Sequence, residues 1–317
     1  MFHVHIHFDP RIAVLVQMTG VLILASGVSR ALDGGDFAVI LVGYLVMRLA
    51  MVTLWLRAAA SDHPGRQCAL RYAVGITVVQ VGWVAWWLAL PRPARLWVFL
   101  VLAAAELAVP LWAESTVRTS WHPGHIAERY GLFTIIVLGE TLLAPTVGVE
   151  VALNDRTSFG HLAPVVIGGL LIVFSMWWLY FDMPSGRIVE QVREAFSERL
   201  TGAFIWGYGH FVVYAGAAAA GAALIVAVDQ ATGHSRLTDL QAGFVLTVPV
   251  VAYLVVVWGL HAPYKKPGWV RSLAVPIAAA LILASSAAPE PVLVTGLLLT
   301  SLVVISVFTN RPEPAGG

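Results

Sequence analysis

Charged residues are scarce in this sequence of 317 residues. Asp, Glu, Lys and Arg make up 12% of it, whereas hydrophobic residues make up 59%. A soluble domain carries about twice that share of charge. The formal net charge is +1, which offers no electrostatic basis for binding nucleic acid. These shortages argue against a soluble domain and against a nucleic-acid partner.

Cysteine and the familiar catalytic motifs are also missing. Cys68 is the single cysteine, so an internal disulfide is excluded. The sequence has no Walker loop, dinucleotide fingerprint, HExxH or GxSxG motif, so we favour a protein that is not an enzyme. The first residues, MFHVHIHFDP, hold no basic stretch ahead of an apolar one, so we expect no cleavable signal.

Long apolar runs are what the sequence does contain. Runs of about 20 residues can cross a bilayer of about 30 Å as helices, and no barrel-like alternation repeats here. Bounded by Gly- and Pro-rich turns, they predict an all-α, polytopic membrane helix bundle of about ten transmembrane helices. The expected helices are 11–32, 37–58, 68–90, 95–113, 124–148, 161–181, 196–228, 239–261, 269–287 and 291–309.

The basic residues divide unequally between the two sides of this topology. Thirteen of the 19 Lys and Arg residues fall on the side of the two termini, and Arg48 lies within a span. The other side holds only Arg30, Arg92, Arg95, Arg156 and Arg236. The positive-inside rule therefore predicts a cell-membrane protein with both termini in the cytoplasm.

A weak internal repeat indicates how the helices are grouped. HFDPR (7–11) and YFDMPSGR (180–187) each lead into a helix rich in small residues. We expect a first repeat of four helices in 1–113, a second of six in 124–309, and a cytoplasmic tail in 310–317. The second repeat has six helices, an even number, so two such repeats would have the same orientation in the membrane. The first repeat would then lack two helices ahead of Met1, which would complete a 6+6 arrangement. The alternative is that membrane helices simply resemble one another.

Two motifs carry a resemblance to a known family. HIAERYGLFTIIVLGET (125–141), followed by WWLYFD (177–182), resembles the signature of the bacterial low temperature requirement A family. The resemblance implies an integral membrane protein and leaves its chemistry open. The family's opening helix, which reads like ELFFDLVFV, has no counterpart here, in agreement with the two helices that the repeat lacks.

Three ionisable residues are predicted near the middle of the membrane. A carboxylate there costs at least about 2–3 kcal/mol and needs a partner, a proton or water. Arg48 is the natural partner, and both Glu140 and Glu106 compete for it; we slightly favour Glu140. Either a substrate or a proton binds to and leaves this pair during function, or the pair is a static salt bridge.

His210 shares a helical stripe with Trp206 and Tyr214. Imidazole titrates near neutral pH, so His210 is a candidate proton relay; the alternative is a neutral histidine that bonds a neighbouring helix. A haem ligand is disfavoured, because no second buried histidine at helical spacing accompanies it.

The remaining candidates lie at helix ends. His125, Glu128 and Arg129 share one face and form either a site at the helix mouth or a headgroup anchor. Asp182 is expected to cap a helix or pair with loop arginines. The alternating histidines of HVHIH (3–7) would suit a metal only on a strand, and we expect no metal site.

Two functions remain open at this point. One is a proton-coupled secondary transporter of a small substrate, with Glu140 loading the proton; the other is a membrane protein that handles lipid or a lipophilic cofactor. No pattern in the sequence identifies a cofactor, and the bilayer is the one evident partner. A transporter should show a polar cavity lined by Arg48, Glu140 and His210.

Overall fold

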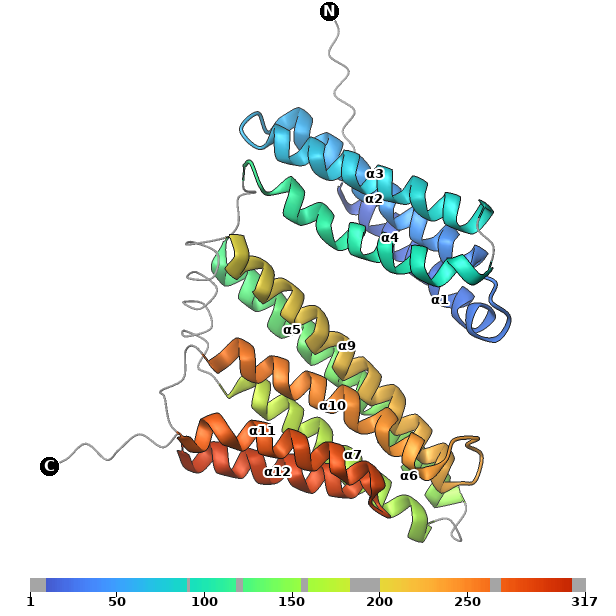
Figure 1. The fold of residues 1–317 in the computed structure, drawn as a ribbon, viewed down its shortest axis with the longest axis vertical. Coiled ribbons are helices and arrows are strands. Elements are labelled where there is room, and N and C mark those ends of the chain that lie inside the picture. Colours follow the sequence, from blue (N-terminus) through green and yellow to red (C-terminus); the bar gives the residue numbers. More distant parts are fainter. Residues whose placement is uncertain are drawn as a thin grey trace, which may run out of the picture. The chain divides into compact units, whose positions relative to one another are not determined.

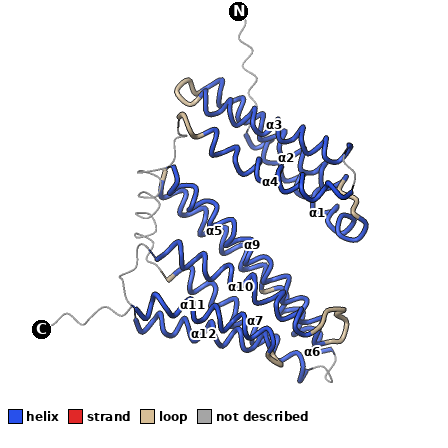
Figure 2. Tube along the Cα trace, in the orientation of Figure 1, coloured by secondary structure: helices blue, strands red, loops and turns tan. Residues whose placement is uncertain are grey.

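The computed structural model describes residues 10–89, 92–117, 122–154, 159–182, 200–262 and 269–309. Within these ranges the chain is helical, and no strand occurs (Figures 1 and 2). Nine helices there are long and apolar enough to cross a membrane, and Ser272–Ala287 forms a shorter apolar helix. The predicted class, a polytopic helix bundle, is confirmed.

The chain forms two compact units, Met1–Trp121 and His122–Gly317. The division falls in the loop that we predicted to separate the two repeats. The repeat relationship itself remains a prediction. The first unit contains α1 (Pro10–Gly34), α2 (Ala38–Ser61), α3 (Arg66–Ala89) and α4 (Arg92–Ala113). The second contains α5 (Pro123–Thr141), α6 (Leu143–Asn154), α7 (Phe159–Phe181), α9 (Leu200–Ala231), α10 (Asp239–His261), α11 (Trp269–Ala284), the 3-10 helix η2 (Ser285–Ala287) and α12 (Pro291–Thr309).

Local chemistry explains several helix ends. Thr238 and Gln241 form a capping box that satisfies backbone N–H groups at the start of α10. Gly35 and Gly233 follow the last turns of α1 and α9 with φ of 68° and 75°, the left-handed conformation that glycine adopts without strain. Pro123 stands at the start of α5, where its missing N–H is harmless.

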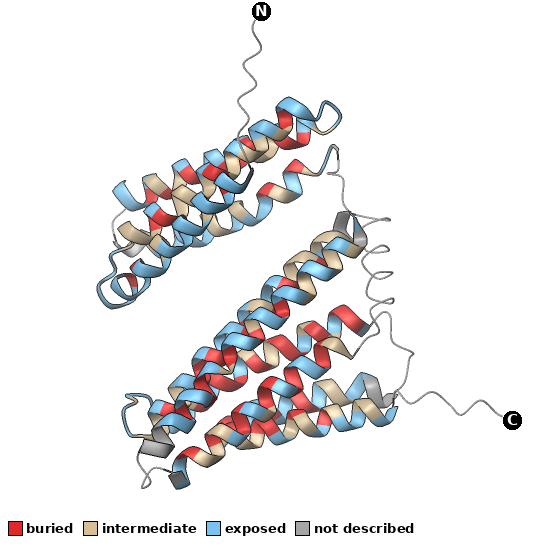
Figure 3. Ribbon diagram, turned by 180° about the vertical axis from the view of Figure 1, so that it is seen from behind, coloured by how far each residue is buried: buried red, intermediate tan, exposed pale blue. Residues whose placement is uncertain are grey.

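The first unit packs its helices in chain order, α1 on α2, α2 on α3 and α3 on α4. Its core joins aliphatic residues of three helices to Trp83 and Trp86, whose rings meet edge to face at 5.8 Å. Much of its surface is exposed (Figure 3), and most of the exposed side chains are apolar, as expected for helices that face lipid.

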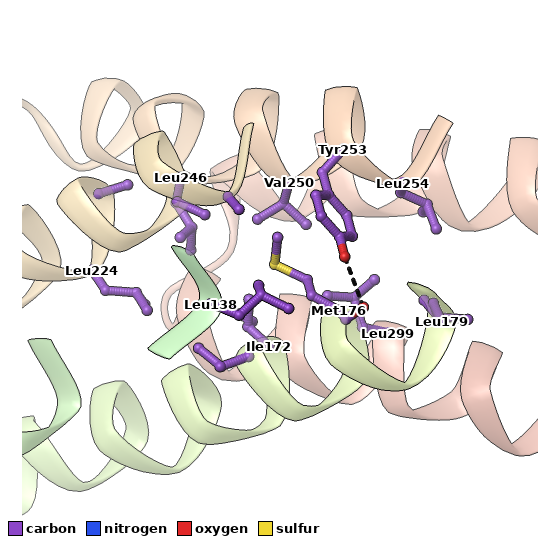
Figure 4. Close-up of a cluster of buried hydrophobic side chains, with 14 of the residues drawn as sticks. Leu138, Ile172, Met176, Leu179, Leu224, Leu246, Val250, Tyr253, Leu254 and Leu299 are labelled. Atoms are coloured by element: carbon purple, nitrogen blue, oxygen red, sulfur yellow. Dashed lines mark hydrogen bonds between the residues drawn. The ribbon is translucent and has the colours of Figure 1, made fainter. Parts of the chain in front are cut away.

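The second unit has a larger core. In it α9 packs against α10 and α12 against α7. In an apolar stretch of 18 residues, 50% of the residues are buried in α7, compared with 11% in α4. Tyr253 of α10 is central to this core, and its hydroxyl donates a hydrogen bond of 2.9 Å to the carbonyl of Met176 on α7 (Figure 4).

One predicted helix, 124–148, is broken at Leu142 into α5 and α6. Pro145 supplies the physical reason. It has no N–H for the carbonyl of Thr141, and its ring clashes with that carbonyl, so the regular hydrogen-bond ladder stops there. The break comes two residues after Glu140. The sequence alone did not lead us to place a break in this span.

Two glycines of α10 provide a test of its packing. A Cβ at Gly243 would meet the backbone of Ser286, whereas a Cβ at Gly259 would have no neighbour within 4 Å. We expect Gly243→Ala to lower the free energy of unfolding by about 1–3 kcal/mol, because the backbones must separate. Gly259→Ala should leave it unchanged or raise it by up to about 1 kcal/mol. Unfolding by SDS titration in mixed micelles measures both, and equal stabilities would contradict this close approach.

Candidate functional site

An ion pair inside the first unit is the best-defined polar site. Arg48 is the eleventh of the 24 residues of α2, and Glu106 lies in the second half of α4. Arg48 Nη2 is 2.9 Å from Glu106 Oε1, with side-chain exposures of 22% and 13%. Both charges therefore lie well inside their spans and are largely shielded by protein.

Neighbouring side chains complete a network around this pair. Glu106 Oε2 accepts a hydrogen bond of 3.2 Å from Trp83 Nε1 and a longer one of 3.5 Å from Gln80 Nε2. Arg48 Nη2 also donates to the hydroxyl of Tyr44 at 2.7 Å, and the guanidinium lies over the Tyr44 ring, 4.8 Å from its centroid. Three helices thus converge on one carboxylate.

The structure corrects our preference for Glu140 as the partner of Arg48. The ion-pair partner is Glu106, which belongs to the same four-helix unit. Glu140 belongs to the second unit and is exposed on the surface of that unit. All three residues were placed near mid-membrane by their distance along a helix. That distance does not show which way a side chain points, so it could not rank the two carboxylates.

A second polar cluster surrounds His210 in the second unit. Its Nδ1 is 2.8 Å from the carbonyl of Trp206, which can only accept, so Nδ1 carries a proton. Its Nε2 is 3.0 Å from the hydroxyl of Tyr180 on α7, and in a neutral ring Nε2 accepts from that hydroxyl. His210 is 1% exposed, and the Tyr130 ring of α5 lies edge-on at 4.5 Å. The cluster therefore joins three helices.

A second buried histidine lies near this cluster, on a different helix. His261, the last residue of α10, is 5% exposed, and its ring centroid is 6.1 Å from that of Tyr180. The His210 ring lies 5.9 Å from the same tyrosine ring. Sequence spacing missed this neighbour because it comes from a different helix. Both rings therefore flank Tyr180.

The predicted cavity lined by Arg48, Glu140 and His210 is not formed within either unit. Arg48 belongs to the first unit and the other two residues to the second. Within the second unit, His210 packs beside Tyr130, and Glu140 lies ten residues, about 15 Å, further along the same helix. The three residues therefore do not share one site inside a unit.

The cluster of His125, Glu128 and Arg129 at the N-terminal end of α5 is exposed. His125 Nδ1 is 3.9 Å from Glu128 Oε2, with side-chain exposures of 77% and 67%. Arg129 is also exposed and makes no salt bridge within the described ranges. Exposed pairs of this kind contribute little free energy. Both interpretations, a site at this end of the helix and a headgroup anchor, stay predictions.

Asp182 joins the end of α7 to α12. Its Oδ2 accepts a hydrogen bond of 2.9 Å from the hydroxyl of Ser306. The loop arginines that we expected to pair with it lie in 183–199, outside the described residues. The HVHIH segment (3–7) also lies outside them.

Besides His261, sequence reasoning missed three hydrogen-bonding residues of these networks: Gln80, Trp83 and Tyr180. Gln80 had a usable signal, because an amide inside an apolar run must find hydrogen-bond partners in lipid. Trp83 and Tyr180 had none, since aromatic residues are common both in packing and at membrane interfaces.

The helices and their internal polar networks define a polytopic α-helical membrane protein. Residues 5–307 match the family described as bacterial low temperature requirement A protein (LtrA), and the chain belongs to this family. It is also similar to a protein of Rhizobium meliloti (strain 1021) named Uncharacterized protein RA0937. The two are 27% identical over 184 residues, which cover 55% of this chain and 44% of that relative. The aligned part is thus less than half the length of the relative. No solved structure matches the chain.

Proposed function

We propose that this protein is a proton-coupled secondary transporter of a small substrate. The observation that carries the proposal is the Arg48–Glu106 pair in the middle of two spans. Such a pair is a poor stabilising device, because apolar residues of similar volume often serve equally well. Ionisable groups at this depth usually mark a pathway for substrate, ions or protons.

The hydrogen bonds around Glu106 give the pair two distinct states. Arg48, Trp83 and Gln80 all direct N–H groups at the carboxylate, so the ionised form can accept every bond. A protonated carboxyl has an O–H group that must find an acceptor, which Arg48 and Trp83 lack and which Gln80 supplies only if its amide turns over. Protonation should therefore loosen the network and release Arg48, which couples a proton to a rearrangement of the helices.

Two further groups are candidates for carrying protons in the second unit. Tyr180 and His210 share a hydrogen bond of 3.0 Å, and the imidazole of His210 is the candidate for relaying protons. Glu140 is exposed on its helix and remains our candidate for the carboxylate that loads the proton, since a charge held within a bilayer would be costly. We further propose that both termini are cytoplasmic, on the basis of the basic loops.

A liposome assay with an internal pH dye tests the transport proposal. Purified protein is reconstituted, a potassium diffusion potential is applied, and internal pH is followed with and without the small-molecule fraction of a bacterial extract. We expect the wild type to move protons well above empty liposomes. Glu106→Gln, which keeps the size of the side chain, should reduce the rate at least about tenfold, and Glu140→Gln should reduce it as well.

Glu290→Gln is the matched control. Glu290 is an exposed carboxylate in the turn before α12 and belongs to neither network, so its replacement should leave the rate unchanged. Equal rates in the wild type and Glu106→Gln would overturn the role given to Glu106. A wild type no faster than empty liposomes, with lipid retained in fixed ratio through purification, would favour the lipid-handling alternative.

A further inference from the structure

We infer that the Arg48–Glu106 network is a binding site for a small uncharged molecule that carries both a hydrogen-bond acceptor and a donor, as a primary amide does. The inference rests on the proposed function and names the class of substrate. It starts from two polar atoms of the network that are buried and have no hydrogen-bond partner among the described residues: Arg48 Nε and Gln80 Oε1.

The unpartnered atom of Gln80 follows from how its amide is oriented. Gln80 is 6% exposed, and its Nε2 faces Glu106 Oε2. Turning the amide over would place Oε1 against the carboxylate, and two acceptors repel one another. The amide oxygen is therefore the atom left over. A buried amide oxygen needs a donor, which a ligand with an N–H or O–H group can supply.

The unpartnered atom of Arg48 follows from how the carboxylate is held. Nη2 is occupied by Glu106 and Tyr44, and Nη1 is 3.5 Å from the sulfur of Met51. Arginine commonly binds a carboxylate through two parallel N–H groups. Here Trp83 and Gln80 hold the second carboxylate oxygen, so the pairing is one-sided and the Nε–H remains for another acceptor.

Charge and surroundings limit what the ligand can be. Arg48 and Glu106 neutralise one another, so a charged ligand would leave a net charge in a low-dielectric interior. Around the pair, the rings of Tyr44 and Trp83 meet edge-on at 6.5 Å, and Phe99 lies 5.2 Å from Trp83. A small planar molecule with one carbonyl and one amide group suits these aromatic neighbours.

The ligands themselves provide the first test. Saturation-transfer NMR on the whole protein in detergent compares acetamide with N,N-dimethylacetamide, which keeps the acceptor but lacks the N–H donor. We expect a signal for acetamide that saturates with concentration and is at least about fivefold stronger than that of the dimethyl compound. Equal or absent signals would overturn the inference, and the two atoms would then be satisfied by bound water only. This comparison uses the wild type alone.

A matched pair of variants provides the second test. Gln80→Leu removes the proposed acceptor and should weaken acetamide binding at least about fivefold. Gln230→Leu is the control, because Gln230 also has a buried, unpartnered Oε1 but belongs to the second unit. It should bind acetamide like the wild type. Equal loss in both variants would overturn the placement of the site beside Gln80.

The two proposals fail in different ways. Acetamide binding that depends on Gln80, without proton movement in liposomes, would support the site and contradict transport. Proton movement that depends on Glu106, without binding of acetamide, would support transport and contradict this class of ligand.

Discussion

Replacing Glu106 by alanine is expected to lower the free energy of unfolding by about 3–5 kcal/mol. The variant leaves the guanidinium of Arg48 without its counter-charge inside the first unit, where its side chain is only 22% exposed. It also removes the acceptor of the Trp83 N–H. SDS titration of the purified protein in mixed micelles, followed by circular dichroism, measures the change.

A double variant separates the loss of a charge partner from the loss of a favourable interaction. Arg48→Met combined with Glu106→Leu removes both charges and keeps the volume. We expect its stability to lie within about 2 kcal/mol of the wild type, the remaining loss coming from the Trp83 N–H left unbonded. If the double variant were less stable than Glu106→Ala, the ion pair would be a net stabilising element. Stability alone would then explain why these two charges lie inside the spans.

The second large effect is expected at Tyr253. Its side chain is 1% exposed at the centre of the second unit's core, packed among residues of α7 and α12 (Figure 4). Tyr253→Ala should lower the free energy of unfolding by about 3–5 kcal/mol, because close packing is lost and a cavity is left. In lipid, packing of this kind is a main force between helices. The same SDS titration measures it.

Two variants show which part of this effect belongs to packing. Tyr253→Phe keeps the ring and removes only the hydrogen bond to Met176, so it should cost about 1 kcal/mol. Val255→Ala, on the same helix with 40% of the residue exposed, should change stability by less than about 1 kcal/mol. A Tyr253→Ala variant as stable as Val255→Ala would show that this core does not hold the unit together.

Most of the helices could be predicted because each one satisfies its backbone hydrogen bonds within its own segment. In lipid every backbone group must be bonded within the segment, so an apolar run of sufficient length and its turn residues determine a span. Where both are described, predicted and observed ends differ by at most three residues, except in the predicted helix 124–148, which breaks at Leu142 and whose second part, α6, continues to Asn154. That break was missed because a proline is tolerated in many membrane helices, and composition does not show where the chain actually bends.

By itself, the sequence determined the class of protein, the family signature in 125–141 and the residues that carry charge within the spans. Only the tertiary structure decided that Arg48 pairs with Glu106, that Gln80 and Trp83 share the same carboxylate, and that Tyr180 bonds His210. The physical reason is geometric. Position along a chain sets how far a side chain lies along its helix, but the rotation of each helix and the choice of its neighbours set which side chains meet. Those two quantities come from the packing of whole helices.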